Sequence, residues 1–260
     1  MSLGLIFLLM TIALIGGICI TTIGPGGIFV TIALFALLDL TPSTVAGTAS
    51  ATFIATGIVG SLAYLRSGEL SKPGARRAAL VLGAASVIGA FAGAQLNTIL
   101  DARLFGIMLG AFVLLTGLII LIRRVMGLSS DADFELNTPK ADIAMVAIGL
   151  GVGLPGGLLG VGGPVLAVPI MVVLGVPMLV GVALAQVQSI FIAAFATVGF
   201  AIHGAIDWSL ALLVGVPLLI GTVAGWYLAR RINPDRLQLG LAAVLIGLGA
   251  YLLIGGGTLN

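Results

Sequence analysis

Two glycine clusters interrupt apolar stretches of the chain, and each is followed by a short apolar run. The first lies in IGPGGIFVTIA at 23–33, and the second lies in LGVGGPVLAVP at 159–169. Glycine can adopt positive φ and lets backbone approach a ligand, and a helix that begins after it exposes free N–H groups with partial positive charge. Such a helix start binds an oxyanion without a lysine. The candidate anion-binding residues are Gly24, Gly26, Gly27, Gly160, Gly162, Gly163 and, at a first helical turn that suits proline, Pro164.

Polar side chains in two later apolar segments are further candidates for the same anion. Thr48, Thr52 and Thr56 recur every four residues and would line one face of a helix, with Ser50 nearly opposite. Hydroxyl and amide groups suit an oxyanion that must be released again, because they hold it without a full charge. The candidates are Thr48, Ser50, Gln186, Gln188 and Ser189.

Both sets of candidates also have a purely structural explanation. Small residues such as glycine let membrane helices cross closely, and glutamine can bridge two helices. Serine and threonine in a membrane helix often bond to a carbonyl of the preceding turn. We favour that bond for Thr52 and Thr56, and we favour anion binding for Ser50, Gln186 and Gln188.

The remaining reactive side chains are few and scattered. Cys19 is the single cysteine and His203 the single histidine, and the long apolar stretches contain no pair of carboxylates. A metal site or a nucleophile with its base cannot be assembled from them, so we predict no enzyme activity, no catalytic residue, no metal and no cofactor. No basic stripe interleaved with aromatic residues suggests nucleic-acid binding. We interpret His203, at the end of an apolar stretch, as an interfacial residue.

The composition places these residues in a membrane. Hydrophobic residues make up 60% of the 260 residues and charged residues 8%, and the mean hydropathy is +1.29. One membrane span needs about 20 apolar residues, and the charge-free stretches are 1–38, 40–65, 78–100, 104–122, 143–202, 208–229 and 237–260. Transmembrane strands would show alternating polarity instead. We therefore predict an all-α polytopic protein of the cell membrane that is in contact with the lipid bilayer.

The glycine clusters belong to a longer internal repeat. At an offset of 136 residues, the distance from Gly24 to Gly160, apolar and glycine positions of the first half match those of the second. After a short deletion the offset becomes 132 residues, the distance from Gly89 to Gly221. Each half then has five helical segments, which are 3–22, 27–38, 44–65, 78–97 and 104–122, then 143–159, 163–175, 180–202, 210–229 and 237–254.

The second segment of each half is short. A helix over 27–38 or 163–175 would reach only about 18 Å, against a hydrocarbon core of about 30 Å. These segments are therefore half-helices, re-entrant elements or strongly broken spans.

The charges of the loops orient the two halves. The loop at 66–77 carries four basic residues, whereas its counterpart at 203–207 carries only one histidine and one aspartate. The next pair of loops reverses this bias, because 230–236 holds three arginines. Basic loops lie on the cytoplasmic side, so we predict inverted repeats with both termini outside. The predicted divisions are a first membrane repeat at 1–124, a cytoplasmic linker at 125–142 and a second membrane repeat at 143–260.

Four stretches carry a resemblance to a known family. They are GLPGGLLGVGGPVLAVPIMVVLGVP at 153–177, its degenerate copy GICITTIGPGGIFVTIALFALLDLTP at 17–42, AGTAS at 46–50 and HGAIDW at 203–208. In this order they resemble the sulfite exporter TauE/SafE family of transmembrane permeases, over nearly the whole chain. The resemblance implies transport of small sulfur-containing anions such as sulfite, sulfoacetate or thiosulfate, usually out of a bacterial or archaeal cytoplasm. The chain departs from the family pattern at Gln186 and Gln188, where a threonine and serine pair is expected.

The pattern as a whole predicts a secondary transporter. Inverted repeats with broken helices are typical of carriers that alternate access around a site near the midplane, where the repeats meet. We expect an exporter of small sulfur-containing anions, because a negative interior drives an anion outward by about 2.3 kcal/mol per charge per 100 mV. An anion channel, or a carrier of another small organic anion, could use the same helix starts.

Overall fold

Every regular element described by the computed structural model is helical. The structure describes residues 1–125, 135–231 and 234–255, and the predicted linker at 125–142 lies partly outside them. The elements are α1 (Leu3–Thr22), α2 (Ile28–Leu37), α3 (Pro42–Arg66), the 3-10 helix η1 (Glu69–Ser71), α4 (Ala75–Asn97), α5 (Ala102–Val125), α6 (Pro139–Leu159), α7 (Pro164–Val173), α8 (Met178–Ile202), α9 (Trp208–Leu228) and α10 (Pro234–Gly255). Eight of these helices are long and apolar enough to cross a membrane. The predicted all-α polytopic membrane fold is confirmed.

The two short segments form short helices. Helices α2 and α7 have 10 residues each, which corresponds to about 15 Å at 1.5 Å per residue and is half the thickness of a hydrocarbon core. Each begins directly after a glycine cluster, because Gly27 precedes the first residue of α2 and Gly163 that of α7. Neither helix can cross a membrane without the chain that flanks it.

Hydroxyl side chains fix the starts of two long helices. Thr41 accepts a hydrogen bond from the Thr44 N–H at the start of α3, and Thr138 accepts one from the Ala141 N–H at the start of α6. In both helices a proline follows the cap, at the position where a missing N–H costs least. Helix α6 therefore begins at Pro139, which is earlier than the predicted boundary at residue 143.

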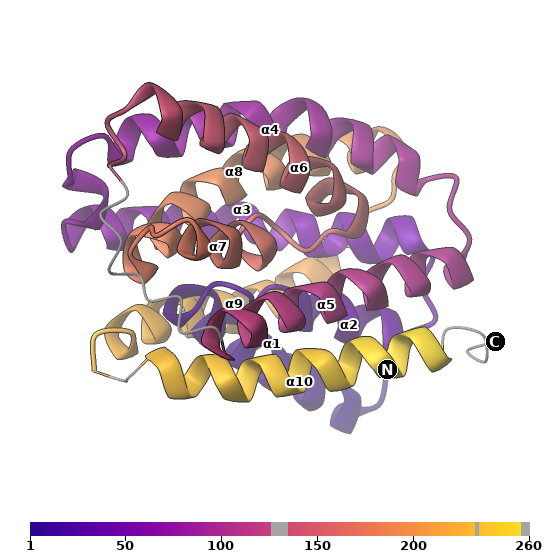
Figure 1. Ribbon diagram of the computed structural model, residues 1–260. Coiled ribbons are helices and arrows are strands. Elements are labelled where there is room, and N and C mark those ends of the chain that lie inside the picture. The colour runs from indigo at the N-terminus through magenta and orange to yellow at the C-terminus, as the bar shows by residue number, and fades with distance from the viewer. Residues whose placement is uncertain (126–134, 232–233, 256–260) are drawn as a thin grey trace.

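The helices pair across the two halves of the chain. Helix α1 packs on α9, α4 on α6, α3 on α8 and α5 on α10, and Figure 1 shows α4 beside α6 and α5 beside α10. The repeat offsets relate α1 to α6 and α9 to α4, so the first two pairs are equivalent. Two halves that fold alike would produce this pairing, while their opposite orientation in the membrane stays a prediction.

Glycine makes the two equivalent crossings tight. A Cβ built on Gly17 would be 2.1 Å from the Leu218 carbonyl oxygen, and one built on Gly153 would be 2.5 Å from the Ser86 carbonyl oxygen. Gly17 and Gly153 are partners at the 136-residue offset, and both bring backbone against backbone. The close-crossing explanation therefore holds for these glycines.

The ends of the bundle differ in charge. In Figure 1 the N-terminus and the end of α10 lie at one end of the bundle, and the end of α5 and the starts of α6 and α10 lie at the other. At this second end Arg77 pairs with Asp142 at 2.5 Å, and Arg230 pairs with Glu69 at 3.8 Å. The 66–77 loop, the start of α6 and the residues after α9 therefore share one end. The basic loops predicted to be cytoplasmic are among these segments.

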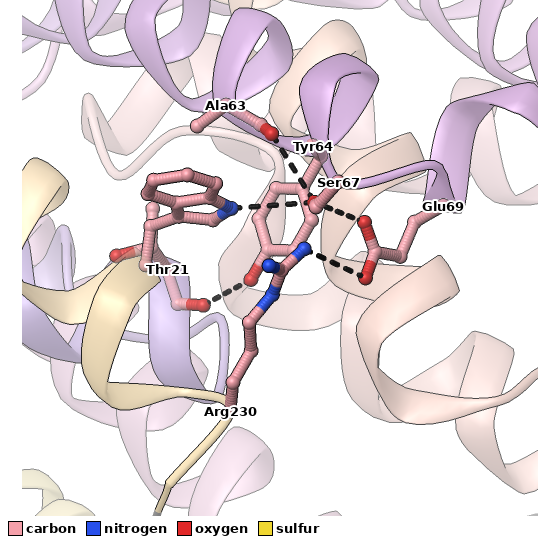
Figure 2. A network of polar contacts seen from close by, with 7 residues as sticks. Thr21, Ala63, Tyr64, Ser67, Glu69 and Arg230 are labelled. Carbon is pink, nitrogen blue, oxygen red and sulfur yellow. Dashed lines mark hydrogen bonds and ion pairs between the residues drawn. The ribbon is translucent and has the colours of Figure 1, made fainter.

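A network of polar contacts ties four elements together at this charged end (Figure 2). The Tyr64 hydroxyl donates to the Thr21 carbonyl, which joins α3 to α1. The Ser67 hydroxyl donates to the Glu69 carboxylate of η1, and Nε1 of Trp226 in α9 donates to Ser67 Oγ at 3.3 Å. The network connects helices of both halves on one side of the bundle.

Candidate functional site

The two glycine segments meet at one small cavity. We define the first glycine segment as residues 24–27 and the second as residues 160–163. The cavity is lined by Ile20, Gly24, Gly27, Phe53, Thr56, Val161, Gly162, Pro164, Val165 and Ser189, all of which are buried. Its volume of about 10 Å³ has room for about one water molecule. Residues from both halves of the chain therefore enclose the same space.

In the described part of the chain, backbone N–H groups without an acceptor lie in the two glycine segments, and of their residues Gly27 and Gly162 line the cavity. Gly27 is the N-terminal cap of α2 and Gly163 that of α7, so both helices begin there. The N–H groups of Gly27, Gly162 and Gly163 have no acceptor within the described residues, although all three residues are buried. A buried N–H group without a partner is rare, because it loses its hydration without compensation. The three groups lie at two helix starts, where the helix dipole adds partial positive charge.

Two hydroxyl side chains also line the cavity, but they differ in what they contact. Ser189 of α8 has its Oγ 3.4 Å from the position of a Cβ built on Gly162. The Thr56 hydroxyl of α3 donates to the Phe53 carbonyl at 3.1 Å. Thr52 makes the same kind of bond to the carbonyl three residues back, at 2.7 Å. Both threonines thus donate to a carbonyl of their own helix, which is the bond we favoured for them from the sequence. The Ser189 hydroxyl lies beside Gly162.

Three glycines of the two segments adopt backbone angles that suit only glycine. Gly24 has φ +104°, Gly160 has φ +61° and Gly162 has φ +76°. A side chain in this left-handed region costs roughly 1–2 kcal/mol. Gly24 and Gly160 are partners in the repeat, so both segments have a glycine with positive φ at the equivalent position.

Two of the predicted glycines pack against other backbone and do not line the cavity. A Cβ on Gly26 would be 2.1 Å from the Gly16 carbonyl oxygen, and one on Gly160 would be 2.4 Å from the Ala46 carbonyl oxygen. The Gly160 carbonyl also accepts a hydrogen bond from the Thr31 hydroxyl at 2.6 Å. Both glycines hold their segments in place behind the lining residues.

The two predicted glutamines lie behind the lining and bond to protein groups. Nε2 of Gln186 donates to the Ile20 carbonyl at 3.3 Å, and Nε2 of Gln188 donates to Ser86 Oγ at 2.9 Å. A Cβ on Gly163 would be 2.8 Å from Oε1 of Gln188. The glutamine side chains therefore brace residues of the cavity wall and of the second glycine segment.

The two predicted polar residues of α3 also lie away from the cavity lining. Thr48 is buried, and its hydroxyl accepts a hydrogen bond from the Asp207 N–H at 3.0 Å. This bond fixes the start of α9, because Asp207 is the N-terminal cap of that helix. Ser50 is buried within α3. Of the predicted polar side chains, the structure brings Ser189 to the cavity.

Comparison with known proteins decides the family. The family model for the sulfite exporter TauE/SafE matches residues 9–252. The chain belongs to the TauE/SafE family. Among curated proteins it is similar to two from Bacillus subtilis (strain 168), "Probable membrane transporter protein YdhB" and "Probable membrane transporter protein YunE". The first is 27% identical over 217 residues, which cover 83% of this chain and 85% of the relative. The second is 25% identical over 270 aligned positions, which cover 96% and 97%. No solved structure matches the chain.

Membership of the TauE/SafE family makes the chain a membrane transporter of a sulfite exporter family. This family is one of membrane permeases. Within the described residues there is no group of three or more His, Cys, Asp or Glu that could hold a metal ion. The cavity lining contains no charged side chain, so any charge it receives is met by dipoles alone.

Four lining residues of this TauE/SafE protein were not among the sequence predictions, and all are apolar. They are Ile20, Phe53, Val161 and Val165. The internal repeat could have predicted one of them, because Phe53 lies 136 residues before Ser189, a predicted site residue. A predicted site residue in one half points to its partner in the other half even where the residue types differ.

Proposed function

We propose that this transporter exports a small sulfur oxyanion such as sulfite, sulfoacetate or thiosulfate, and binds it in the cavity between the two glycine segments. The observation that carries the proposal is the set of buried N–H groups of Gly27, Gly162 and Gly163 without acceptors. An oxyanion supplies several acceptors to such donors, and two helix starts favour its negative charge. Family membership favours a sulfur oxyanion over other anions.

The neutral lining suits a substrate that must leave again. A lysine or arginine in the cavity would hold an anion by a charge-assisted bond, which is roughly twice as strong as a neutral one. N–H groups and the Ser189 hydroxyl hold it more weakly. A membrane potential that is negative inside then drives each charge outward by about 2.3 kcal/mol per 100 mV.

Transport through this cavity requires a conformational change. Sulfite has four heavy atoms, whereas the cavity of about 10 Å³ has room for about one water molecule. The cavity must therefore widen and open to each side in turn. We propose that the two halves act as inverted repeats and rock against each other around the cavity, at the packing of α3 on α8.

The test is efflux of labelled anions from liposomes that contain the purified protein and hold a set membrane potential. Gly162→Ala places a methyl group 3.4 Å from Ser189 Oγ, in the cavity itself. We expect its sulfite efflux to fall about tenfold or more, which corresponds to roughly 1.4 kcal/mol. The matched control is Gly151→Ala in α6, because a Cβ there meets nothing within 4 Å.

Each outcome of this test bears on one part of the proposal. No flux of sulfite, sulfoacetate or thiosulfate in the unaltered protein overturns the substrate class. Unchanged flux in Gly162→Ala overturns the site. Saturation and counterflow support a carrier, whereas a current without saturation shows an anion channel.

A further inference from the structure

Phe53 of α3 lies between the two glycine segments. A Cβ built on Gly27 would be 3.0 Å from Cζ of Phe53, and one built on Gly162 would be 3.5 Å from its Cδ2. The ring therefore approaches backbone of both segments where neither has a side chain. Phe53 is 2% exposed and is the only aromatic residue that lines the cavity.

The ring takes up space that the anion needs. The cavity measures about 10 Å³, and the other lining side chains are smaller than phenylalanine. Core packing resists the insertion of even one extra methylene group. The room for an anion beside Gly27 and Gly162 therefore depends on the Phe53 ring as well as on how far the two halves widen the cavity.

A second lining residue beside Gly162 differs from Phe53 in size and polarity. Ser189, the partner of Phe53 at the 136-residue offset, is small and polar and lies beside Gly162. An anion in the cavity would meet the Ser189 hydroxyl, the N–H groups of the glycines and the apolar ring of Phe53. Its oxygens can accept hydrogen bonds from the polar groups, whereas an added carbon chain needs space that the ring fills.

We propose that Phe53 is a size filter, which admits a compact sulfur oxyanion such as sulfite and excludes an anion with an added carbon chain such as sulfoacetate. This inference rests on the proposed function and names the substrate within it. The filter acts by steric exclusion, because the ring contributes neither charge nor a hydrogen bond donor. Shortening the side chain therefore widens the range of substrates.

The experiment compares sulfoacetate and sulfite efflux in the unaltered protein, in Phe53→Leu and in a control. The control is Phe112→Leu, because Phe112 is buried in α5 and does not line the cavity. We expect the sulfoacetate-to-sulfite flux ratio to be low in the unaltered protein and to rise about tenfold or more in Phe53→Leu. A pocket discriminates a single methylene group by about 10–200-fold, and sulfoacetate adds a methylene and a carboxylate to the sulfur group. Phe112→Leu should leave the ratio unchanged.

A second variant and a second measurement keep the inference testable if Phe53→Leu does not fold. Phe53→Met is close to phenylalanine in volume but flexible, and it should raise the same ratio. Sulfoacetate should raise the Tm of the detergent-solubilised Phe53 variants, and it should raise the Tm of the unaltered protein only slightly.

An equal flux of both anions in the unaltered protein, or an unchanged sulfoacetate-to-sulfite ratio in both Phe53 variants, overturns the filter. A lack of flux for every anion overturns the proposed function instead.

Discussion

The two glycine segments occupy equivalent places in the two halves, yet they are packed differently. Gly26 of the first segment lies against the backbone of α1, and its Cβ position is 2.4 Å from the Ile20 nitrogen. Gly162, its partner in the repeat, has the nearest atoms at 3.4 Å and 3.5 Å and lines the cavity. Glycine at this position thus packs against backbone in one half and lines the cavity in the other.

The third helices of the two halves continue this difference. Helix α3 presents Phe53 to the cavity, whereas α8 presents Ser189 at the equivalent position. The glutamines of α8 brace the cavity wall, while Thr48 of α3 fixes the start of α9. The two halves therefore contribute an aromatic ring and a hydroxyl group to the cavity from equivalent positions.

The largest effect is expected when the partner glycines Gly26 and Gly162 are each replaced by alanine, because one packs against backbone and the other lines the cavity. Gly26→Ala inserts a methyl group 2.1 Å from a backbone oxygen, and backbone cannot rotate away as a side chain can. We expect a loss of stability at or above the upper end of the roughly 1–3 kcal/mol that overpacking costs, and little folded protein. Gly162→Ala should lose only the roughly 1–2 kcal/mol of its left-handed backbone. The yield of monodisperse protein in detergent measures both, and equal yields would contradict the distinction.

A smaller effect is expected where the first short helix reaches the second glycine segment. Thr31 of α2 donates to the Gly160 carbonyl at 2.6 Å, and its partner in the repeat is Ala167, which has no hydroxyl. Thr31→Val keeps the shape but leaves a buried carbonyl without this donor, at a cost of about 1–3 kcal/mol.

The control for Thr31→Val is Thr116→Val in α5, because the Thr116 hydroxyl bonds only to its own helix, at the Phe112 carbonyl. Thermal unfolding in detergent should show a lower Tm for Thr31→Val than for Thr116→Val. Equal Tm values would show that the link between α2 and the second glycine segment contributes no stability.

The smallest effect is expected at the loop between the third and fourth helices, where the halves also differ. In the first half this loop contains η1, and Glu69 pairs with Arg230 at 3.8 Å. The side chain of Arg230 is 45% exposed, so the pair is partly screened and Glu69→Gln should cost less than about 1 kcal/mol. The difference in Tm from the unaltered protein should shrink in 1 M salt, where the screening length is about 3 Å. A difference that persists undiminished in high salt would show that the ion pair is not its cause.

Hydropathy and spacing predicted the framework well, because burial in lipid demands long apolar helices. The short helices after Gly27 and Gly163, and the grouping of the basic 66–77 loop with Arg230, follow from patterns along the chain. The helix faces were harder to predict. The sequence does not show that Gly26 contacts α1, or that Gln186 bonds to Ile20, because these contacts depend on how helices distant in sequence cross.

Phe53 shows a second limit of sequence reasoning. An aromatic residue in an apolar segment has the signature of ordinary core packing, and nothing near it in the chain marks it as part of a site. The structure shows its place by setting it against glycines from both halves. The repeat partner Ser189 was predicted, so a search by equivalent position would have found it.

The backbone crossings of α1 on α9 and of α4 on α6 have a consequence for how this sequence can change over time. At Gly17 and Gly153 a single added methyl group meets a carbonyl oxygen, so any side chain there would force the two backbones apart. Ile88 and Leu212 are examples of exposed apolar residues on the outer surface. At such positions one hydrophobic side chain can replace another. We therefore expect substitutions to accumulate more readily on the outer surface than at the glycines of the crossings, whichever anion is carried.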